Sequence, residues 1–497
     1  MAPELDFGTY RAGAEAFVEA TDREYLLHLS GRKPELELAP IYERHADLFT
    51  AAAVESLTEA AEGAEGDEGR RRRYLLRFAF DGLLGEATKA EAEEAAGLEA
   101  SLEVAVDGRA VPYRQVPVEQ ANESDAGRRQ QLELARNALL AERLNPVHLQ
   151  ALERAHALCR ELGWRSYADA YAGLRSLDFG SLAERTARLL AATESAYAPA
   201  VDPLLERAAL PPLGELRRSD MPRFFRAPDL DRGFPAERLV PALAETLAGL
   251  GIDLERQAGV HLDTESRPSK SPRAFCAPVR VPDEVHLVIS PVGGRDDFAA
   301  LFHEAGHTEH YACVDPALAF EFRHLGDNAV TESFAFLLEH LTEDPEWLRA
   351  RLGVGDAEPV VANARAVRLV MLRRYAAKLA YERELHGEGV ALAEMPARYA
   401  ELLTGAIRVD WPQTSWLADV DPGFYVSCYL RAWALEAIWR DALHERFGAR
   451  WFERREAGDW LRELWAQGQR LGAEELVGDA LGRELSFEPL IAELAAG

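Results

Sequence analysis

Apolar residues return every three or four positions along most of the chain, which is the spacing that places them on one face of an α-helix. The pattern is clearest in two stretches rich in Ala, Leu, Glu and Arg, residues 126–162 and 364–385. These residue types also have high intrinsic helix propensity. The sequence therefore predicts a mainly α protein.

Strand patterns are few and fall into two pairs. Residues 102–106 and 110–116 flank an Asp-Gly pair, and residues 274–281 and 284–289 flank a Pro-Asp pair. A short polar turn between two apolar runs predicts a β-hairpin in each case. The second hairpin lies just before the most informative segment of the chain and predicts a small β-sheet beside it.

Prolines concentrate between Pro199 and Pro241. Proline interrupts helices and is typical of connecting segments, so this stretch predicts a loop-rich connection between short helices. We expect an N-terminal, mainly helical region over residues 1–265 and a catalytic region over residues 266–497, with lobes that interleave in space.

Composition and charge exclude several classes of protein. The chain has 497 residues, of which 48% are hydrophobic, and 84 Asp and Glu against 56 Lys and Arg give a net charge of −28. A globular fold is expected, and nucleic acid is an unfavourable partner for such an acidic chain. The start of the sequence does not resemble a secretory signal, no run is long and apolar enough to span a membrane, and the four cysteines contain no CxxC pair. We expect a cytoplasmic protein without a membrane or nucleic-acid partner; the sequence does not indicate an oligomeric state.

The most informative segment is HEAGH at positions 303–307, which continues an apolar helical run. Residues four apart lie on one face of a helix, so His303 and His307 can direct ring nitrogens to one metal ion. Glu304 lies beside them, where its carboxylate can take a proton from a water on that metal. Two histidines, a third protein ligand and an open water position form the usual catalytic zinc site. The motif therefore predicts one Zn2+ per chain.

The third ligand distinguishes the classes of zinc enzyme. A metzincin has a histidine where this chain has Cys313, and the thermolysin-like spacing of about twenty residues reaches no glutamate. Glu332 lies 25 residues after His307 and begins an apolar helical segment. We expect Glu332, on a second helix packed across the first, to complete the site.

Three further residues compete for the metal: His310, His324 and Glu321. His310 follows His307 by three residues and would crowd a site that already holds His303. We therefore expect His310 and His324 on the surface or just outside the ligand set.

The segment LFHEAGH at 301–307 resembles the LFHEFGH motif of the M3-type zinc oligopeptidases, the thimet oligopeptidase and oligoendopeptidase F family of gluzincins, with Ala305 in place of Phe. The spacing to Glu332 is also similar to the spacing in that family. Weaker similarities lie at residues 162–168, at 424–429, where FYVSCY resembles FYVYQY, and in the closing segment 451–490.

The resemblance implies a two-lobed helical shell around a deep substrate channel, with zinc on its floor. Such a channel would admit short peptides and exclude folded proteins. The implied activity is that of a zinc-dependent metallopeptidase hydrolysing internal peptide bonds of short unfolded oligopeptides. Three departures leave the substrate preference open. Ala329 replaces an Asp of the family, Ser333-Phe334 replaces a Pro-Ser, and residues 419–423 replace its His-containing, Gly-rich loop.

Tyr425 and Tyr429 are four residues apart in a helical pattern that Trp433 continues. From spacing alone, an aromatic stripe packed in the core is the simpler interpretation. The resemblance implies instead that these two phenols are catalytic and donate hydrogen bonds to the oxyanion or to the substrate carbonyl. Which phenol would do which is not indicated.

Residues 285–289 form a candidate edge strand, with which an extended peptide could pair through its main chain. The alternative is a buried hairpin strand without substrate contact. His286 on this strand is expected to be structural.

Two other functions compete with the internal cleavage of short peptides. A carboxydipeptidase of the converting-enzyme type would need a fixed cation for the substrate C-terminus, and Arg373, Arg374, Lys378 and Arg431 are the candidates. A catalytically inactive peptide-binding homologue would need no general base, which Glu304 supplies. A structural zinc site would need a fourth ligand, and Cys313 could serve only by breaking the helix.

Overall fold

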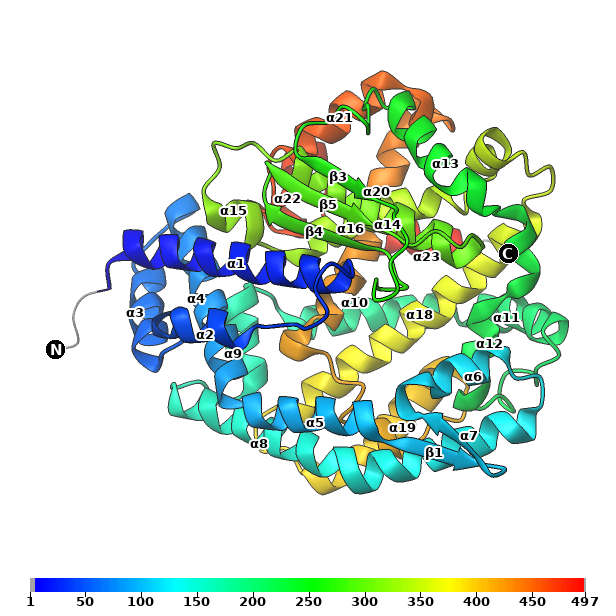
Figure 1. Ribbon diagram of the computed structural model, residues 1–497, viewed down its shortest axis with the longest axis horizontal. Helices are drawn as coiled ribbons and strands as arrows, with labels where there is room; N and C mark the ends of the chain where they lie inside the picture. Colours follow the sequence, from blue (N-terminus) through cyan, green and yellow to red (C-terminus); the bar gives the residue numbers. More distant parts are fainter. Residues whose placement is uncertain (1–4, 496–497) are drawn as a thin grey trace. The chain divides into compact units, whose positions relative to one another are not determined.

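The computed structural model describes residues 5–495. Helices hold most of these residues, and the five strands within this range form two small sheets (Figure 1). The prediction of a mainly α protein with a small sheet is confirmed. Within residues 5–495, no helix combines the length and the hydropathy that a membrane crossing requires.

The chain divides into two compact units. The first comprises residues 1–80, 228–361 and 431–490, and the second comprises 81–227, 362–430 and 491–497. Both units therefore combine segments from before and after residue 265, the boundary expected from the sequence. One division point, between residues 227 and 228, falls inside the proline-rich stretch.

The second unit is built from helices and one hairpin. The hairpin strands are β1 (Glu103–Val106) and β2 (Arg109–Pro112), so the predicted turn is confirmed although the second strand is shorter than expected. The helices that lie wholly or mostly in this unit are α5 (Lys89–Ser101), α6 (Val116–Asn122), α7 (Ala126–Leu139), α8 (Asn145–Glu161), α9 (Tyr167–Arg175), α10 (Phe179–Ala192), α11 (Glu194–Arg207), α12 (Met221–Arg226), α18 (Glu358–Leu385), α19 (Met395–Ile407) and α23 (Glu488–Ala495).

The first unit carries the HEAGH segment. Its helices, wholly or mostly within the unit, are α1 (Phe7–Leu29), α2 (Ala39–Arg44), α3 (Ala51–Glu62), α4 (Gly66–Ala87), α13 (Ala236–Gly249), α14 (Arg295–Ala312), α15 (Phe320–His324), α16 (Asn328–Leu341), α17 (Pro345–Trp347), α20 (Val426–Phe447), α21 (Arg455–Trp465) and α22 (Ala473–Leu481). HEAGH begins at the middle of α14.

A three-stranded sheet of the first unit packs against α14. Its strands are β3 (Val260–Asp263), β4 (Phe275–Arg280) and β5 (Glu284–Val288), in the order β3-β5-β4 (Figure 1). β5 pairs with β4 in the predicted hairpin and, in parallel, with β3. The expectation of an edge strand at 285–289 is therefore wrong, because β5 is hydrogen-bonded on both sides. The pattern of apolar residues in β5 reflects burial in the centre of the sheet.

The approach of α14 to α16 depends on Gly306. A Cβ at this position would lie 2.4 Å from the carbonyl oxygen of Phe334 and 2.5 Å from the Cα of Ala335, both backbone atoms of α16. Because backbone atoms cannot swing aside as a flexible side chain can, only glycine allows the two helices to pack this closely. The contact fixes the distance between the HEAGH face and the residues of α16.

Replacing Gly306 with alanine is expected to push α14 and α16 apart. We expect a loss of about 1–3 kcal/mol, the usual cost of an inserted methyl group in a packed interior, and a lower thermal unfolding midpoint. The matched control is Gly478→Ala in α22 of the same unit, where the nearest atom to a new Cβ is a carbonyl oxygen at 4.0 Å. There the midpoint should be unchanged or rise, since alanine is the better helix former. Equal midpoints for the two variants would contradict the close-packing argument.

Candidate metal centre

The loop before α14 fixes where the helix begins. The carboxylate of Asp297, in the first turn, accepts hydrogen bonds from the backbone N–H groups of Val292 (2.6 Å) and Gly293 (2.8 Å). Gly293 and Gly294 have φ values of 89° and 91°, a region that side chains other than glycine rarely adopt. These hydrogen bonds therefore join the first turn of α14 to the segment that follows β5.

His303, His307 and Glu332 meet between α14 and α16. Their ligand atoms lie within 4.8 Å of one another. The Nε2 atoms of His303 and His307 are 3.5 Å and 3.7 Å from the same Glu332 carboxylate oxygen. Glu332 is buried, whereas the two imidazoles remain partly exposed. The predicted ligand set is thus brought together, from the two helices that the sequence indicated.

Each imidazole is held at its other nitrogen. The Nδ1 of His303 lies 2.8 Å from a carboxylate oxygen of Glu339, and the Nδ1 of His307 lies 2.8 Å from the hydroxyl of Thr331. These contacts at Nδ1 turn the Nε2 atoms towards Glu332, which is how metal-binding histidines are usually oriented. Both partners belong to α16, so one helix supplies the carboxylate ligand and the orientation of both rings.

Sequence reasoning did not find Glu339 or Thr331. Glu339 lies seven residues, two helical turns, after Glu332, and this spacing places both carboxylates on one face of α16. That periodicity was a usable signal for Glu339. Thr331 has no comparable signal, because its role depends on how the two helices cross.

Glu304 lies beside the ligands and is held by the sheet. Its Oε2 accepts a 2.8 Å hydrogen bond from the backbone N–H of Cys276 in β4. Burial raises the pKa of the Glu304 carboxyl to about 7, against the opposing effects of His303 and of the Cys276 hydrogen bond. A carboxyl group with a pKa near neutrality can both accept and return a proton at physiological pH.

The electrostatic surroundings favour a cation at the ligand nitrogens. Burial lowers the pKa of His303, but Glu332 and Glu339 more than offset it, and the pKa is raised to about 10. Burial lowers the pKa of His307 to about 3, so this ring is neutral. An acidic surround with a neutral imidazole is a suitable environment for a divalent metal ion.

The competing ligands are engaged elsewhere. Glu321 is buried and forms ion pairs with Arg11 and, at 3.5 Å, with Arg71. His310 is fully buried, and its ring packs on Phe334 at 5.1 Å between centroids. His310 is predicted on the surface or just outside the ligand set. It does not lie on the surface, so that part of the prediction is wrong. His324 is half-buried and stacks against Tyr311 at 6.4 Å.

A cavity of about 450 Å³ adjoins the candidate ligands. It is lined by Pro272, Arg273, Ala274, Asp296, Asp297, Ala299, Ala300, His303, Glu304 and Glu339. Its volume is in the usual range for small-ligand sites. The candidate metal ligand His303, the neighbouring carboxyl group of Glu304 and the side chain of Arg273 thus line one cavity of the first unit.

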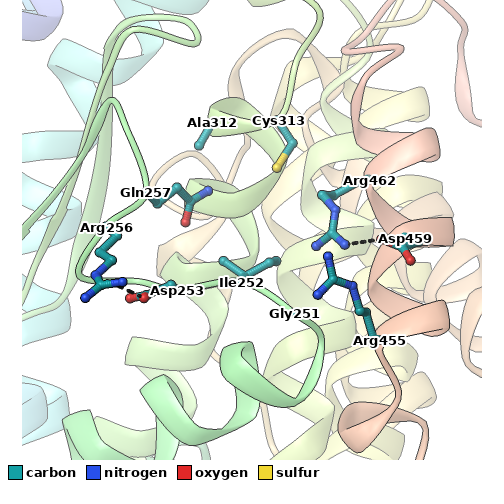
Figure 2. Close-up of a pocket in the computed structure, with 10 residues that line it drawn as sticks. All are labelled: Gly251, Ile252, Asp253, Arg256, Gln257, Ala312, Cys313, Arg455, Asp459 and Arg462. Atoms are coloured by element: carbon teal, nitrogen blue, oxygen red, sulfur yellow. Dashed lines mark hydrogen bonds and ion pairs between the residues drawn. The ribbon is translucent and has the colours of Figure 1, made fainter.

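A second cavity of about 480 Å³ lies at the C-terminal end of α14 (Figure 2). Two of its arginines are paired with aspartates, Arg462 with Asp459 and Arg256 with Asp253. Burial raises the pKa of the Cys313 thiol there to about 12, so the thiol is not a nucleophile at neutral pH. This cavity offers no acid–base pair and is not a candidate catalytic site.

Tyr425 and Tyr429 lie in the second unit, at the start of α20. Their rings meet edge to face at 5.1 Å, and Tyr429 also contacts Tyr375 at 5.4 Å. Both phenols are half-buried. Trp433, which continues the stripe into the first unit, stacks on Phe336 at 5.0 Å and therefore has a packing role. The catalytic assignment of the two tyrosines stays a prediction.

Comparison with known proteins does not identify a family: no protein-family model matches the chain, and no curated protein matches it.

Glu339→Ala is expected to weaken metal binding by roughly 10-fold to 100-fold, because His303 would lose the group that orients its ring. Glu339→Gln keeps a hydrogen-bond acceptor and should lose less. Competition with a chromogenic chelator measures the affinity, and circular dichroism checks the fold. Unchanged zinc affinity in the alanine variant would show that Glu339 does not orient the ligand.

Proposed function

We propose that this chain is a zinc-dependent metallopeptidase that hydrolyses internal peptide bonds of short unfolded oligopeptides. The observation that carries the proposal is the convergence of His303, His307 and Glu332, with ligand atoms within 4.8 Å of one another. Glu304 lies one position beyond the first ligand and lines the adjoining cavity. Resemblance of the HEAGH segment and its spacing to the M3-type oligopeptidases supports the same conclusion.

The donor set fits zinc. Two imidazole nitrogens and one carboxylate oxygen are typical zinc ligands, and among the described residues the group contains these three and no fourth. Three protein ligands favour a catalytic site over a structural one, which closes with a fourth ligand. A bound zinc ion would act as a Lewis acid and lower the pKa of a coordinated water molecule to about 7.

Glu304 is proposed as the general base. One of its carboxylate oxygens is held by the N–H of Cys276, which leaves the other to accept a proton from the attacking water. Water adds to the carbonyl carbon, the C–N bond breaks, and the same carboxyl group returns the proton to the leaving nitrogen. The pKa of about 7 suits both transfers.

The edge of the sheet supplies a main-chain contact for substrate. Among the described strands β4 pairs on one side only, with β5, and the residue before it, Ala274, lines the cavity next to Glu304. An extended peptide along this end of β4 would be held through its backbone, which is compatible with broad sequence tolerance. We propose β4 for this role in place of the central strand β5.

The remaining features of the proposal rest on the resemblance. They are the two-lobed shell with a deep channel and the restriction to short unfolded peptides. One zinc ion per chain is proposed from the HEAGH motif, and a cytoplasmic location from the composition of the sequence.

The four cations considered as binding sites for a substrate C-terminus do not support a carboxydipeptidase activity. Arg373 pairs with Glu194, Arg374 with Asp419, Lys378 with Asp421 at 3.0 Å, and Arg431 with Asp327 at 2.6 Å. A guanidinium or ammonium group that already holds a carboxylate is a poor site for a second one.

Glu304→Gln should keep zinc and lose about 10²-fold to 10⁴-fold in turnover, because the amide cannot accept the proton. Glu332→Ala should lose zinc, since only two ligands remain. Metal analysis by mass spectrometry, combined with a mixed-peptide digest, measures both effects. Full activity of Glu304→Gln would contradict the assigned base, and full zinc content of Glu332→Ala would contradict the third ligand.

Tyr425→Phe and Tyr429→Phe separate the two interpretations of the tyrosine pair. If either phenol stabilises the oxyanion, its loss should lower kcat by about 10²-fold or more and leave KM nearly unchanged. If both only pack, kcat should stay within a few-fold of the wild-type value, and a change would appear in the thermal midpoint instead.

A further inference from the structure

Arg273 lies on the wall of the cavity that holds the candidate ligand His303 and the proposed base Glu304. It is the only arginine or lysine in that lining. Its side chain is exposed, and it lies two residues before the first residue of β4. A cation at this distance from the proposed reaction centre bears on which peptides bind there.

The guanidinium of Arg273 forms no hydrogen bond or ion pair with another described residue, whereas nearby acidic groups are engaged. Asp297 holds the N–H groups of Val292 and Gly293, and Glu339 holds the His303 ring. Lys270, three residues earlier, is buried and donates to Asp263 and to three backbone carbonyls. Arg273 is thus a charged group whose hydrogen-bonding capacity is not used by the fold.

The backbone of Arg273 is nevertheless fixed. The N–H of Ser271 donates to the carbonyl of Leu29 at 2.7 Å, and the Ser271 hydroxyl bonds to both the N–H and the carbonyl of Arg273. Three residues further on, the N–H of Cys276 binds Glu304. The backbone of Arg273 therefore has a fixed position relative to Glu304, and the residue lines the same cavity.

We propose that Arg273 determines specificity by binding a carboxylate of the peptide substrate, an inference that rests on the proposed function. A guanidinium group binds a carboxylate through two parallel hydrogen bonds. The net charge of −28 opposes the approach of anionic groups, so a local cation is needed for one to bind. The carboxylate can be the C-terminal one or that of an Asp or Glu side chain, because both present the same two oxygens.

Peptide binding tests the proposal without relying on turnover. The zinc-loaded Glu304→Gln protein is titrated into three fluorescently labelled peptides by anisotropy. The first has neutral side chains and a free C-terminus, the second is its C-terminal amide, and the third is the amide with one Asp. The same titrations are made with Arg273→Ala, with Arg273→Lys, and with Arg256→Ala, which removes an equal charge from the second cavity.

We expect Arg273→Ala to raise Kd for a carboxylate-bearing peptide by roughly 10-fold to 100-fold, the range for a hydrogen bond to a charged group. Kd for the neutral amide should change less than 2-fold to 3-fold, Arg273→Lys should restore part of the loss, and Arg256→Ala should have little effect. A loss confined to the free C-terminus assigns that group, and a loss confined to the Asp peptide assigns the side chain.

Equal losses for all three peptides, no loss for either carboxylate, or no binding of any peptide would overturn the assignment of Arg273. Turnover of the same peptides by the wild-type protein is measured separately. Binding that depends on Arg273, without turnover by the zinc-loaded wild type, would contradict the peptidase proposal and leave the carboxylate site standing.

Discussion

The short distance between α14 and α16 is the constraint on which the candidate site depends. Gly306 has no side chain to separate the helices where they approach, and a carboxylate oxygen of Glu332 lies 3.5 Å and 3.7 Å from the Nε2 atoms of the two imidazoles. The buried carboxylate costs several kcal/mol of desolvation if it is left uncompensated. Close packing of the helices therefore leaves a buried negative charge that a cation at the centre would compensate.

The surrounding hydrogen bonds determine how that charge is compensated. Glu339 and Thr331 contact the Nδ1 atoms and so turn the Nε2 atoms towards Glu332. In the absence of metal, protonation of His303 supplies one positive charge, consistent with its raised pKa. A divalent ion would supply two and leave the ring neutral, so metal binding at this cluster would be coupled to the stability of the packing. The site belongs to one compact unit, and its ligands need no residue of the other.

Periodicity and spacing predicted much of this arrangement. The 3.6-residue period gave the helices, the i, i+4 relation placed His303 and His307 on one face, and the distance to Glu332 gave the second helix. The position of β5 in the centre of the sheet could not be read from its apolar run, because β3 joins it from a segment distant in the sequence. Likewise, the engagement of Glu321 by Arg11 is a tertiary contact across 310 residues, without a local signal.

The alternative functions are distinguished better by whether a polar side chain already has a partner within the protein than by its residue type. An inactive binding protein gains nothing from Glu304, whose pKa is raised to about 7 by burial. A carboxyl group with a folded-state pKa above its unfolded value stabilises the fold only at low pH, and this contribution is lost as the pH rises from about 4.5 through 7. At neutral pH Glu304 is thus a cost to folding, and such costs are typically retained where chemistry requires them. By the same criterion Arg273 differs from Arg373, Arg374, Lys378 and Arg431. These four side chains already form ion pairs with carboxylates of the protein, whereas Arg273 forms none with another described residue.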